Sequence, residues 1–202
     1  MNRKGKFIVF EGIDGCGKTT QMTHIAQRLK GAGKKCVITC EPTKAEIGKM
    51  LRRYLSGEIT ADSHVIAALF AADRLDHILR PGGLLDTLED DVYILCDRYY
   101  LSSYAYQSMD VDLDWLMSLN AVSTEKLKPD FHVFIDITPE TSLNRLKDRE
   151  NLEIFEKEEK LKLIYDNYHK VIDKLRHTEN IAVIDGDRAE ISITEDIWKL
   201  LL

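Results

Sequence analysis

One stretch near the start of the chain, Gly12-Ile13-Asp14-Gly15-Cys16-Gly17-Lys18-Thr19, has the residue types and spacing of a phosphate-binding loop. It matches G-x-x-x-x-G-K-[ST] and lies between an apolar run at 7–10 and a helical pattern, the context that this motif requires. Glycines let backbone N–H groups face a phosphate, and the following helix adds its positive N-terminal end. Lys18 would reach the β- and γ-phosphates, and the Thr19 hydroxyl would coordinate Mg²⁺. We therefore predict that a nucleoside triphosphate binds at Gly12, Ile13, Asp14, Gly15, Cys16, Gly17, Lys18, Thr19 and Thr20.

A second pair of residues with chemical potential, Asp97 and Arg98, directly follows the apolar run 92–96. An arginine at the end of a strand beside the loop could bridge donor and acceptor phosphates with its two-pronged guanidinium. Asp97 is typical of an acid that holds Mg²⁺ directly or through water. Phosphoryl transfer between two nucleotides brings two polyanions together and so requires cations and a metal. Taken alone, an Asp-Arg pair would more often be a structural ion pair.

The elements that must position these residues alternate along the chain. Five short apolar runs, at 7–10, 36–39, 92–96, 131–137 and 181–184, are separated by helical patterns, the clearest at 45–56, 62–80 and 153–177. Buried strands separated by helices predict a parallel sheet covered on both faces, with right-handed connections. The fold class is therefore predicted to be α/β, a doubly wound parallel five-stranded sheet, with the site beyond the carboxyl ends of the strands. No linker or repeat divides the chain, so residues 1–202 are expected to form a single domain.

Composition and charge exclude several other classes of protein. The chain has 202 residues, with 28 Lys and Arg against 34 Asp and Glu, a net charge of −6. Eight basic and two acidic residues give the first 35 positions +6, which leaves −12 for the remainder. An acidic body argues against binding of a nucleic-acid polymer. Four cysteines without a C-x-x-C pair indicate a reducing, cytoplasmic setting, and the four-residue run at 7–10 is too short for a signal peptide or a membrane span.

The sequence resembles one known family closely. The segment Asp97-Arg98-Tyr99, followed by Ser102-Ser103-Tyr104-Ala105-Tyr106-Gln107, resembles the signature of thymidylate kinases. Further matching segments occur in the same order: Phe10-Glu11-Gly12-Ile13-Asp14, Glu41-Pro42, Glu46-Ile47-Gly48-Lys49, Leu69-Phe70-Ala71-Ala72-Asp73-Arg74 and Lys128-Pro129-Asp130. The resemblance implies a P-loop nucleotide kinase fold and phosphoryl transfer from ATP with Mg²⁺ to dTMP, giving dTDP. It also implies a cytoplasmic homodimer whose ligands are small nucleotides, with no membrane association.

The resemblance also implies where the acceptor nucleotide binds. Phe70 would stack on the pyrimidine, Arg74 would hold the base edge or order the pocket, and Arg52 would hold the acceptor phosphate. Ser103, Tyr106 and Gln107 match positions that line the base and the sugar, Asp14 matches an acid near the sugar 3′-hydroxyl, and Arg98 would contact the phosphate. Read from the residues alone, Phe70 could equally belong to the core, because it shares a helix face with Ile66.

The sequence departs from the family pattern at three places. Cys40 stands where the family often has the arginine of Arg-Glu-Pro, so Lys44 or Arg52 would have to replace that cation. Gly15 and Ile154 occupy the two positions from which family members supply a catalytic arginine. In the lid segment expected at about 145–158, Arg145 and Arg149 are the remaining candidates. The predicted catalytic residues are therefore Lys18, Asp97, Arg98, Arg145 and Arg149, with Thr19 and Asp97 as metal ligands.

These departures leave alternatives open. The third departure, Ser108-Met109-Asp110 after Gln107, replaces a Gly-rich basic continuation and would reshape the acceptor pocket. The acceptor could then be another nucleoside monophosphate or a deoxynucleoside. A chain that has lost the lid arginine could also be a catalytically weak nucleotide-binding paralogue.

Overall fold

The computed structural model describes residues 5–88, 92–147 and 154–201, which contain one parallel sheet of five strands. The strands are β1 (Lys6–Glu11), β2 (Lys35–Cys40), β3 (Val92–Asp97), β4 (Phe131–Asp136) and β5 (Ile181–Asp185), in the order β2-β3-β1-β4-β5. All four neighbouring pairs are parallel, and their register places Phe10 opposite both Asp97 and Val133. The predicted five-stranded parallel sheet is confirmed.

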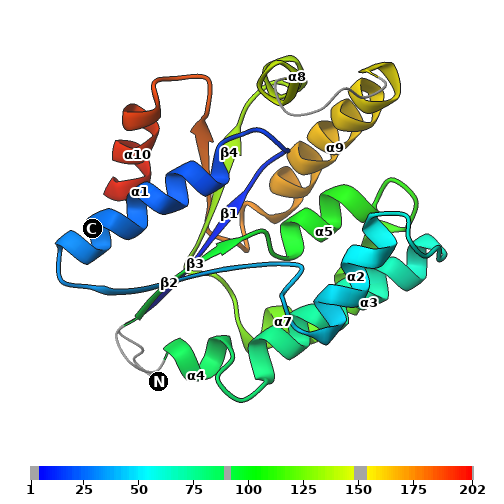
Figure 1. Ribbon diagram of the computed structural model, residues 1–202, viewed down its shortest axis with the longest axis horizontal. Helices are drawn as coiled ribbons and strands as arrows, with labels where there is room; N and C mark the ends of the chain where they lie inside the picture. Colours follow the sequence, from blue (N-terminus) through cyan, green and yellow to red (C-terminus); the bar gives the residue numbers. More distant parts are fainter. Residues whose placement is uncertain (1–4, 89–91, 148–153, 202) are drawn as a thin grey trace.

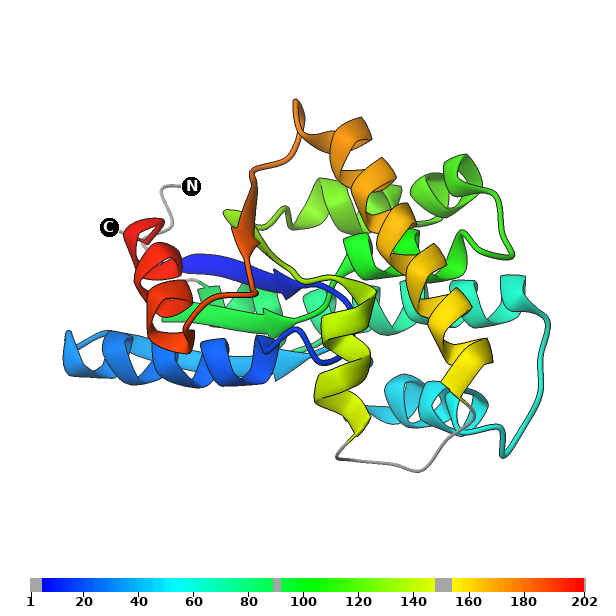
Figure 2. The same ribbon diagram turned by 90° about the horizontal axis from the view of Figure 1, so that it is seen from above.

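Helices cover both faces of the sheet, as Figure 1 shows. On one face α1 (Lys18–Gly31) lies beside α10 (Glu190–Lys199). The other face carries α3 (Ser63–Leu79), α4 (Leu84–Leu88), α5 (Tyr100–Gln107), α7 (Ala121–Lys126) and α9 (Ile154–Leu175), and α2 (Glu46–Leu55) packs on α3. Figure 2 shows α8 (Pro139–Lys147) beside the loop that joins β1 to α1, and α6 (Leu113–Leu119) contacts α5. This arrangement is the doubly wound α/β fold expected from the sequence.

The core is built around β1, the central strand. Phe7, Ile8, Val9 and Phe10 are fully buried, as are the neighbouring residues Ile94, Leu95 and Cys96 of β3. Burial on both faces explains why these strands read as continuous apolar runs rather than as alternating patterns. The loops at the carboxyl ends of β1 and β3 therefore start from buried strands of the core.

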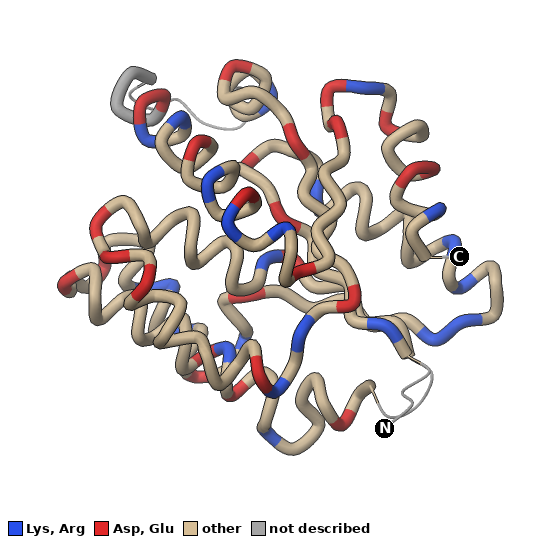
Figure 3. The backbone as a smooth tube through the Cα atoms, turned by 180° about the vertical axis from the view of Figure 1, so that it is seen from behind, with Lys and Arg blue, Asp and Glu red and all other residues tan. Residues whose placement is uncertain are grey.

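The helix α5 was not evident from periodicity, because Tyr100-Leu101-Ser102-Ser103-Tyr104 contains residues of modest helix propensity. Its first six residues are all buried, so tertiary packing rather than propensity stabilises this helix. None of the described helices is long and apolar enough to cross a membrane. Acidic and basic residues are interspersed over the backbone and form no single basic stripe among the described residues (Figure 3).

Candidate active site

The phosphate-binding loop leaves β1 after Glu11 and enters α1 at Lys18. Its three glycines have positive φ angles, 138° at Gly12, 77° at Gly15 and 99° at Gly17. Space as well as conformation requires glycine at position 12, because a Cβ there would lie 2.7 Å from both the carbonyl oxygen of Ile135 and the Sγ of Cys16. The loop thus wraps closely around the start of α1, as the motif predicts.

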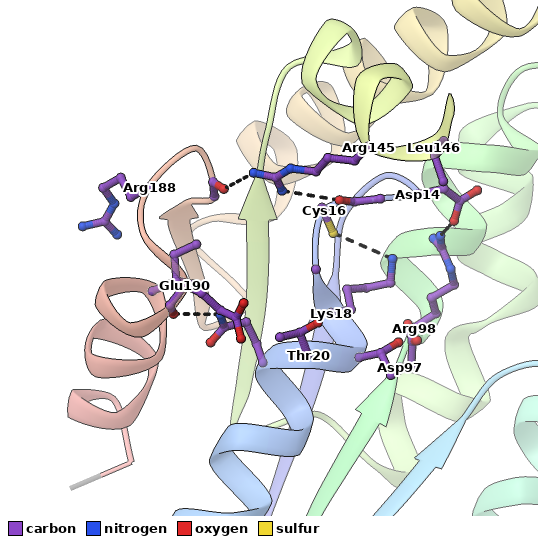
Figure 4. A pocket seen from close by; sticks show the side chains of 16 residues that line it. Asp14, Cys16, Lys18, Thr20, Asp97, Arg98, Arg145, Leu146, Arg188 and Glu190 are labelled. Atoms are coloured by element: carbon purple, nitrogen blue, oxygen red, sulfur yellow. Dashed lines mark hydrogen bonds and ion pairs between the residues drawn. The ribbon is translucent and has the colours of Figure 1, made fainter. Parts of the chain in front are cut away.

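The ammonium of Lys18 lies within this loop. It donates to the carbonyl oxygens of Gly12 at 3.2 Å and Ile13 at 3.4 Å, and the side chain is nearly buried. Thr19 and Thr20, the next two residues of α1, are exposed. The loop opens onto a cavity of about 690 Å³, which we call the donor cleft (Figure 4). Its lining residues are Asp14, Gly15, Cys16, Gly17, Lys18, Thr19, Thr20, Gln21, Asp97, Arg98, Arg145, Leu146, Gly186, Arg188, Glu190 and Ile193.

Thr19 and Asp97 fit a Mg²⁺ site. Both line the donor cleft, and they come from neighbouring elements, the start of α1 and the end of β3. The Oδ1 of Asp97 is buried and accepts no hydrogen bond within the part of the chain that the structure describes. A buried carboxylate oxygen without a partner is costly, and hydroxyl and carboxylate oxygens are the ligands that Mg²⁺ prefers. The described residues contain no cluster of three or more His, Cys, Asp or Glu that would hold a different metal.

Arg98 is held at the junction of β3 and α5 in a left-handed conformation, with φ 69°. Among the described residues it is the only non-glycine residue with positive φ, a geometry that costs about 1–3 kcal/mol and tends to occur at functional sites. Its N–H donates to the carbonyl oxygen of Phe10 at 3.0 Å, which fixes the backbone against the central strand. The guanidinium lies over the ring of Tyr106 at 4.8 Å and pairs with Asp14 at 2.5 Å. Burial alone would raise the pKa of Asp14, but Arg98 and Lys18 outweigh it, so this pKa is lowered.

Glu11 is a buried carboxyl behind Arg98 that our site prediction missed. It accepts hydrogen bonds from the N–H of Tyr99 at 3.0 Å, from the Ser102 hydroxyl and from the Tyr168 hydroxyl at 3.1 Å. Burial raises the pKa of Glu11 to about 7, although these hydrogen bonds and the charge of Arg98 act in the opposite direction. The sequence shows Glu11 only as the last residue of an apolar strand; Ser102 and Tyr168, its partners, are distant in sequence.

A second cavity, of about 190 Å³, lies on the other side of Arg98, and we call it the acceptor pocket. Its lining residues are Asp14, Glu41, Pro42, Leu55, Phe70, Arg74, Arg98, Tyr99, Ser102, Ser103, Tyr106 and Gln107. Of the predicted acceptor residues, seven therefore lie together. Phe70 is half-buried and lies outside the buried core cluster, which favours the stacking role over the core role. The Oε1 of Gln107 is buried without a hydrogen-bond partner among the described residues, as expected of a group that awaits a ligand.

Arg74 lines this pocket but is committed to the protein. Its Nε donates to Glu41 at 2.8 Å, one Nη to Asn120 and the other to Ser103 at 3.0 Å. Only 1% of the side chain is exposed. Of the two roles that the resemblance allowed, this geometry favours ordering the pocket over contacting the base edge.

Arg52, the predicted phosphate ligand, lies beside the acceptor pocket rather than in its lining. Its guanidinium donates to the main-chain carbonyls of Pro42 at 2.5 Å, Gly48 at 3.2 Å and Thr43. Lys44, the other candidate, lines a separate cavity of about 460 Å³ together with Cys40. That cavity shares Thr19 and Asp97 with the donor cleft but no lining residue with the acceptor pocket, whereas Arg52 bonds to Pro42 in the wall of that pocket.

Arg145 is placed at the donor cleft by α8. It donates to the carbonyl oxygens of Gly186 at 3.0 Å and Gly15 at 3.4 Å, and it lies 3.5 Å from Asp187. Arg149 lies outside the described residues, as does the middle of the lid expected at about 145–158, residues 148–153. Figure 4 also shows Arg188 and Glu190 at the opposite wall of the cleft. Our sequence analysis did not name them; their one signal was their place just after the fifth strand.

Comparisons with known proteins agree with this geometry. The family model described as thymidylate kinase matches residues 10–197. A probable thymidylate kinase of Methanococcus aeolicus is 40% identical over 171 residues, 84% of this chain and 80% of the relative. A thymidylate kinase of Caldicellulosiruptor saccharolyticus is 38% identical over 189 residues, 88% of each chain. A probable thymidylate kinase of Pyrococcus horikoshii is 38% identical over 198 residues, 93% of this chain and 94% of the relative.

Proposed function

The chain belongs to the thymidylate kinase family, and we propose that it transfers the γ-phosphoryl group of ATP to dTMP, giving ADP and dTDP. One observation carries the proposal: Asp14 and Arg98 line both the donor cleft and the acceptor pocket. A single guanidinium thus faces both sites. Such an arrangement suits an in-line transfer between two nucleotides bound on either side of it.

In this mechanism the protein supplies position and positive charge. The loop N–H groups and Lys18 hold the β- and γ-phosphates of ATP, while Arg98 neutralises charge on the transferring group and on the acceptor phosphate. Phe70 and Tyr106 enclose the acceptor base and sugar, and Gln107 offers its free oxygen to an N–H of the base. Thr19 and Asp97 would hold Mg²⁺, which neutralises phosphate charge when bound. No covalent enzyme intermediate is needed, because orientation and charge neutralisation suffice.

Arg98 must exchange partners to do this. In the structure its Nη2 is bonded to Asp14, whose side chain is 61% exposed. An acceptor phosphate would displace this carboxylate, which then becomes free to accept from the sugar 3′-hydroxyl. The ion pair therefore keeps the arginine oriented until a nucleotide arrives.

The acceptor identity is tested by an ADP-release assay with ATP, Mg²⁺ and a panel of dTMP, dUMP, dCMP and thymidine. We expect the highest kcat/KM with dTMP and little turnover with thymidine, which lacks the phosphate that Arg98 would bind. Folded protein that binds ATP but shows no stimulation by dTMP would contradict the proposal. Preference for another nucleotide would instead point to the reshaped segment at 108–110.

We also propose that the protein is a cytoplasmic homodimer. Apolar side chains on α2 and α3, Met50, Leu55, Val65 and Leu79, are 45–56% exposed, which is compatible with helix packing between two copies. Light scattering coupled to size-exclusion chromatography would measure the mass, with 23.2 kDa as the value for a single chain.

A further inference from the structure

The two Nη atoms of Arg98 have partners of different character. Nη2 bonds to Asp14 at 2.5 Å and to the hydroxyl of Tyr106 at 3.0 Å, at the side that opens to the cavities. Nη1 bonds to the hydroxyls of Ser102 and Tyr168, both at 3.2 Å, on the side that faces the interior. Tyr168 is fully buried in α9, and Ser102 is nearly buried in α5.

The protons on the Nη1 side can be assigned consistently. Ser102 donates its hydroxyl proton to Oε2 of Glu11, and Tyr168 donates to the same oxygen at 3.1 Å. Their two oxygens lie 2.7 Å apart, so the Tyr168 hydroxyl proton also serves a hydrogen bond to the Ser102 oxygen. Each oxygen keeps a lone pair to accept one N–H of Nη1. The Glu11 carboxylate thus orients both hydroxyls so that they act as acceptors toward the arginine.

We propose that Tyr168 is a positioning residue for Arg98, fixing the Nη1 edge of the guanidinium while the Nη2 edge exchanges Asp14 for phosphate. This inference rests on the proposed function, because it assigns Arg98 to phosphate. An arginine side chain has a long flexible stem, so without a second hold the guanidinium would turn with its phosphate partner. Tyr168 holds the guanidinium by a hydrogen bond from α9, which is a different element from α5 and from the loop that contains Asp14.

The test compares Tyr168→Phe with Tyr100→Phe as a matched control. Both changes remove one hydroxyl from a buried tyrosine, but the Tyr100 hydroxyl bonds to Glu179 and His132, away from Arg98. We expect Tyr168→Phe to lower kcat about tenfold, the effect of losing one hydrogen bond to a charged group, with KM for ATP unchanged within twofold. Tyr100→Phe should leave kcat within twofold of the wild type at a similar loss of thermal stability. Equal kcat for the two variants would overturn the proposal.

A second measurement does not depend on turnover. A double-mutant cycle by urea unfolding combines each tyrosine variant with Arg98→Lys. The changes in unfolding free energy caused by Tyr168→Phe and Arg98→Lys should be non-additive, whereas those caused by Tyr100→Phe and Arg98→Lys should add. Additive effects for Tyr168 would contradict the contact on which the proposal stands. Absence of wild-type turnover with dTMP would instead count against the proposed function alone, and the cycle would still decide the role of Tyr168.

Discussion

Two arginines line the acceptor pocket, yet they are held in opposite ways. Arg74 lies on a regular helix, is 1% exposed and pairs with the equally buried Glu41. Arg98 has a left-handed backbone conformation, its side chain is 19% exposed, and it pairs with the mostly exposed carboxylate of Asp14. A buried ion pair has no solvent to replace a lost partner, whereas an exposed carboxylate can be exchanged at small cost. The comparison indicates that Arg74 stabilises the wall of the acceptor pocket and that Arg98 binds the ligand.

Replacing Arg98 should have the largest effect on catalysis. Among the described residues Arg98 is the one cation that lines both cavities, so Arg98→Ala is expected to lower kcat by about 10³-fold or more. Its unfolding free energy should change less than that of an Arg74 variant. A steady-state assay with dTMP gives the first value and urea denaturation the second. A fall of less than tenfold would break the contrast between the two arginines.

Replacing Arg74 should act on stability instead. Arg74→Met removes the charged partner of the buried Glu41 and leaves the His77 ring, 3.1 Å from its Oε1, beside the carboxylate. The unfolding free energy is expected to fall by about 3–5 kcal/mol. The double variant Glu41→Gln with Arg74→Met should recover part of this loss, because no lone charge then remains. Urea unfolding of the three proteins measures both effects. If Arg74→Met is fully stable but binds dTMP poorly, the arginine contacts the base after all.

The carboxyl behind Arg98 predicts a dependence of stability on pH. The pKa of Glu11 is raised from 4.5 to about 7 in the folded protein, so the folded state holds this proton more tightly than the unfolded chain. Its contribution is therefore fully present below about pH 4.5 and is lost as pH rises through 7, a change of about 3 kcal/mol. Glu11→Gln should remove this part of the slope between pH 5 and pH 8. Parallel stability curves for the two proteins would argue that Glu11 ionises normally.

Arg145 is intermediate between the two arginines, since its hydrogen bonds are to main-chain carbonyls, and both its side chain and that of its ion-pair partner Asp187 are 39% exposed. If it supplies the cation absent at Gly15, Arg145→Ala should lower kcat by about 10²-fold with little change in stability. Arg149→Ala tests the other lid candidate in the same assay, and the variant with the larger loss of kcat identifies the arginine that supplies the cation. Wild-type turnover that is already negligible, and unaffected by either change, would favour the weak-paralogue alternative.

The smallest expected effect concerns the base. Phe70→Ala should raise KM for dTMP about tenfold through lost stacking, while kcat changes less. A Phe→Ala change in a core costs about 3–5 kcal/mol of unfolding free energy. Because Phe70 is only half-buried, its replacement should cost less. A cavity-sized loss with unaltered KM would return Phe70 to the core.

Much of the fold was predictable from the sequence because it depends on patterns of neighbouring residues. The central strands β1 and β3 were found as apolar runs because they are buried on both faces, whereas the edge strands β2 and β5 kept short apolar runs although they are partly exposed. The loop was found because its glycines and Lys18 lie within one short segment. By contrast, α5 was missed because packing forms it. The sequence did not decide the roles of Arg52 and Arg74, because the family resemblance matches positions but does not show which groups contact them in this chain.

The sequence by itself determined the five strands and their order along the chain, the phosphate-binding loop and the family, since each depends on residues that are close together or matched in order. Only the tertiary structure decided which cations are committed and which can serve a ligand. Arg74 meets Glu41 across 33 positions, and Arg98 meets Tyr168 across 70. A charge becomes structural or catalytic through its burial and its partners, and these are properties of packing between distant segments rather than of the residue type.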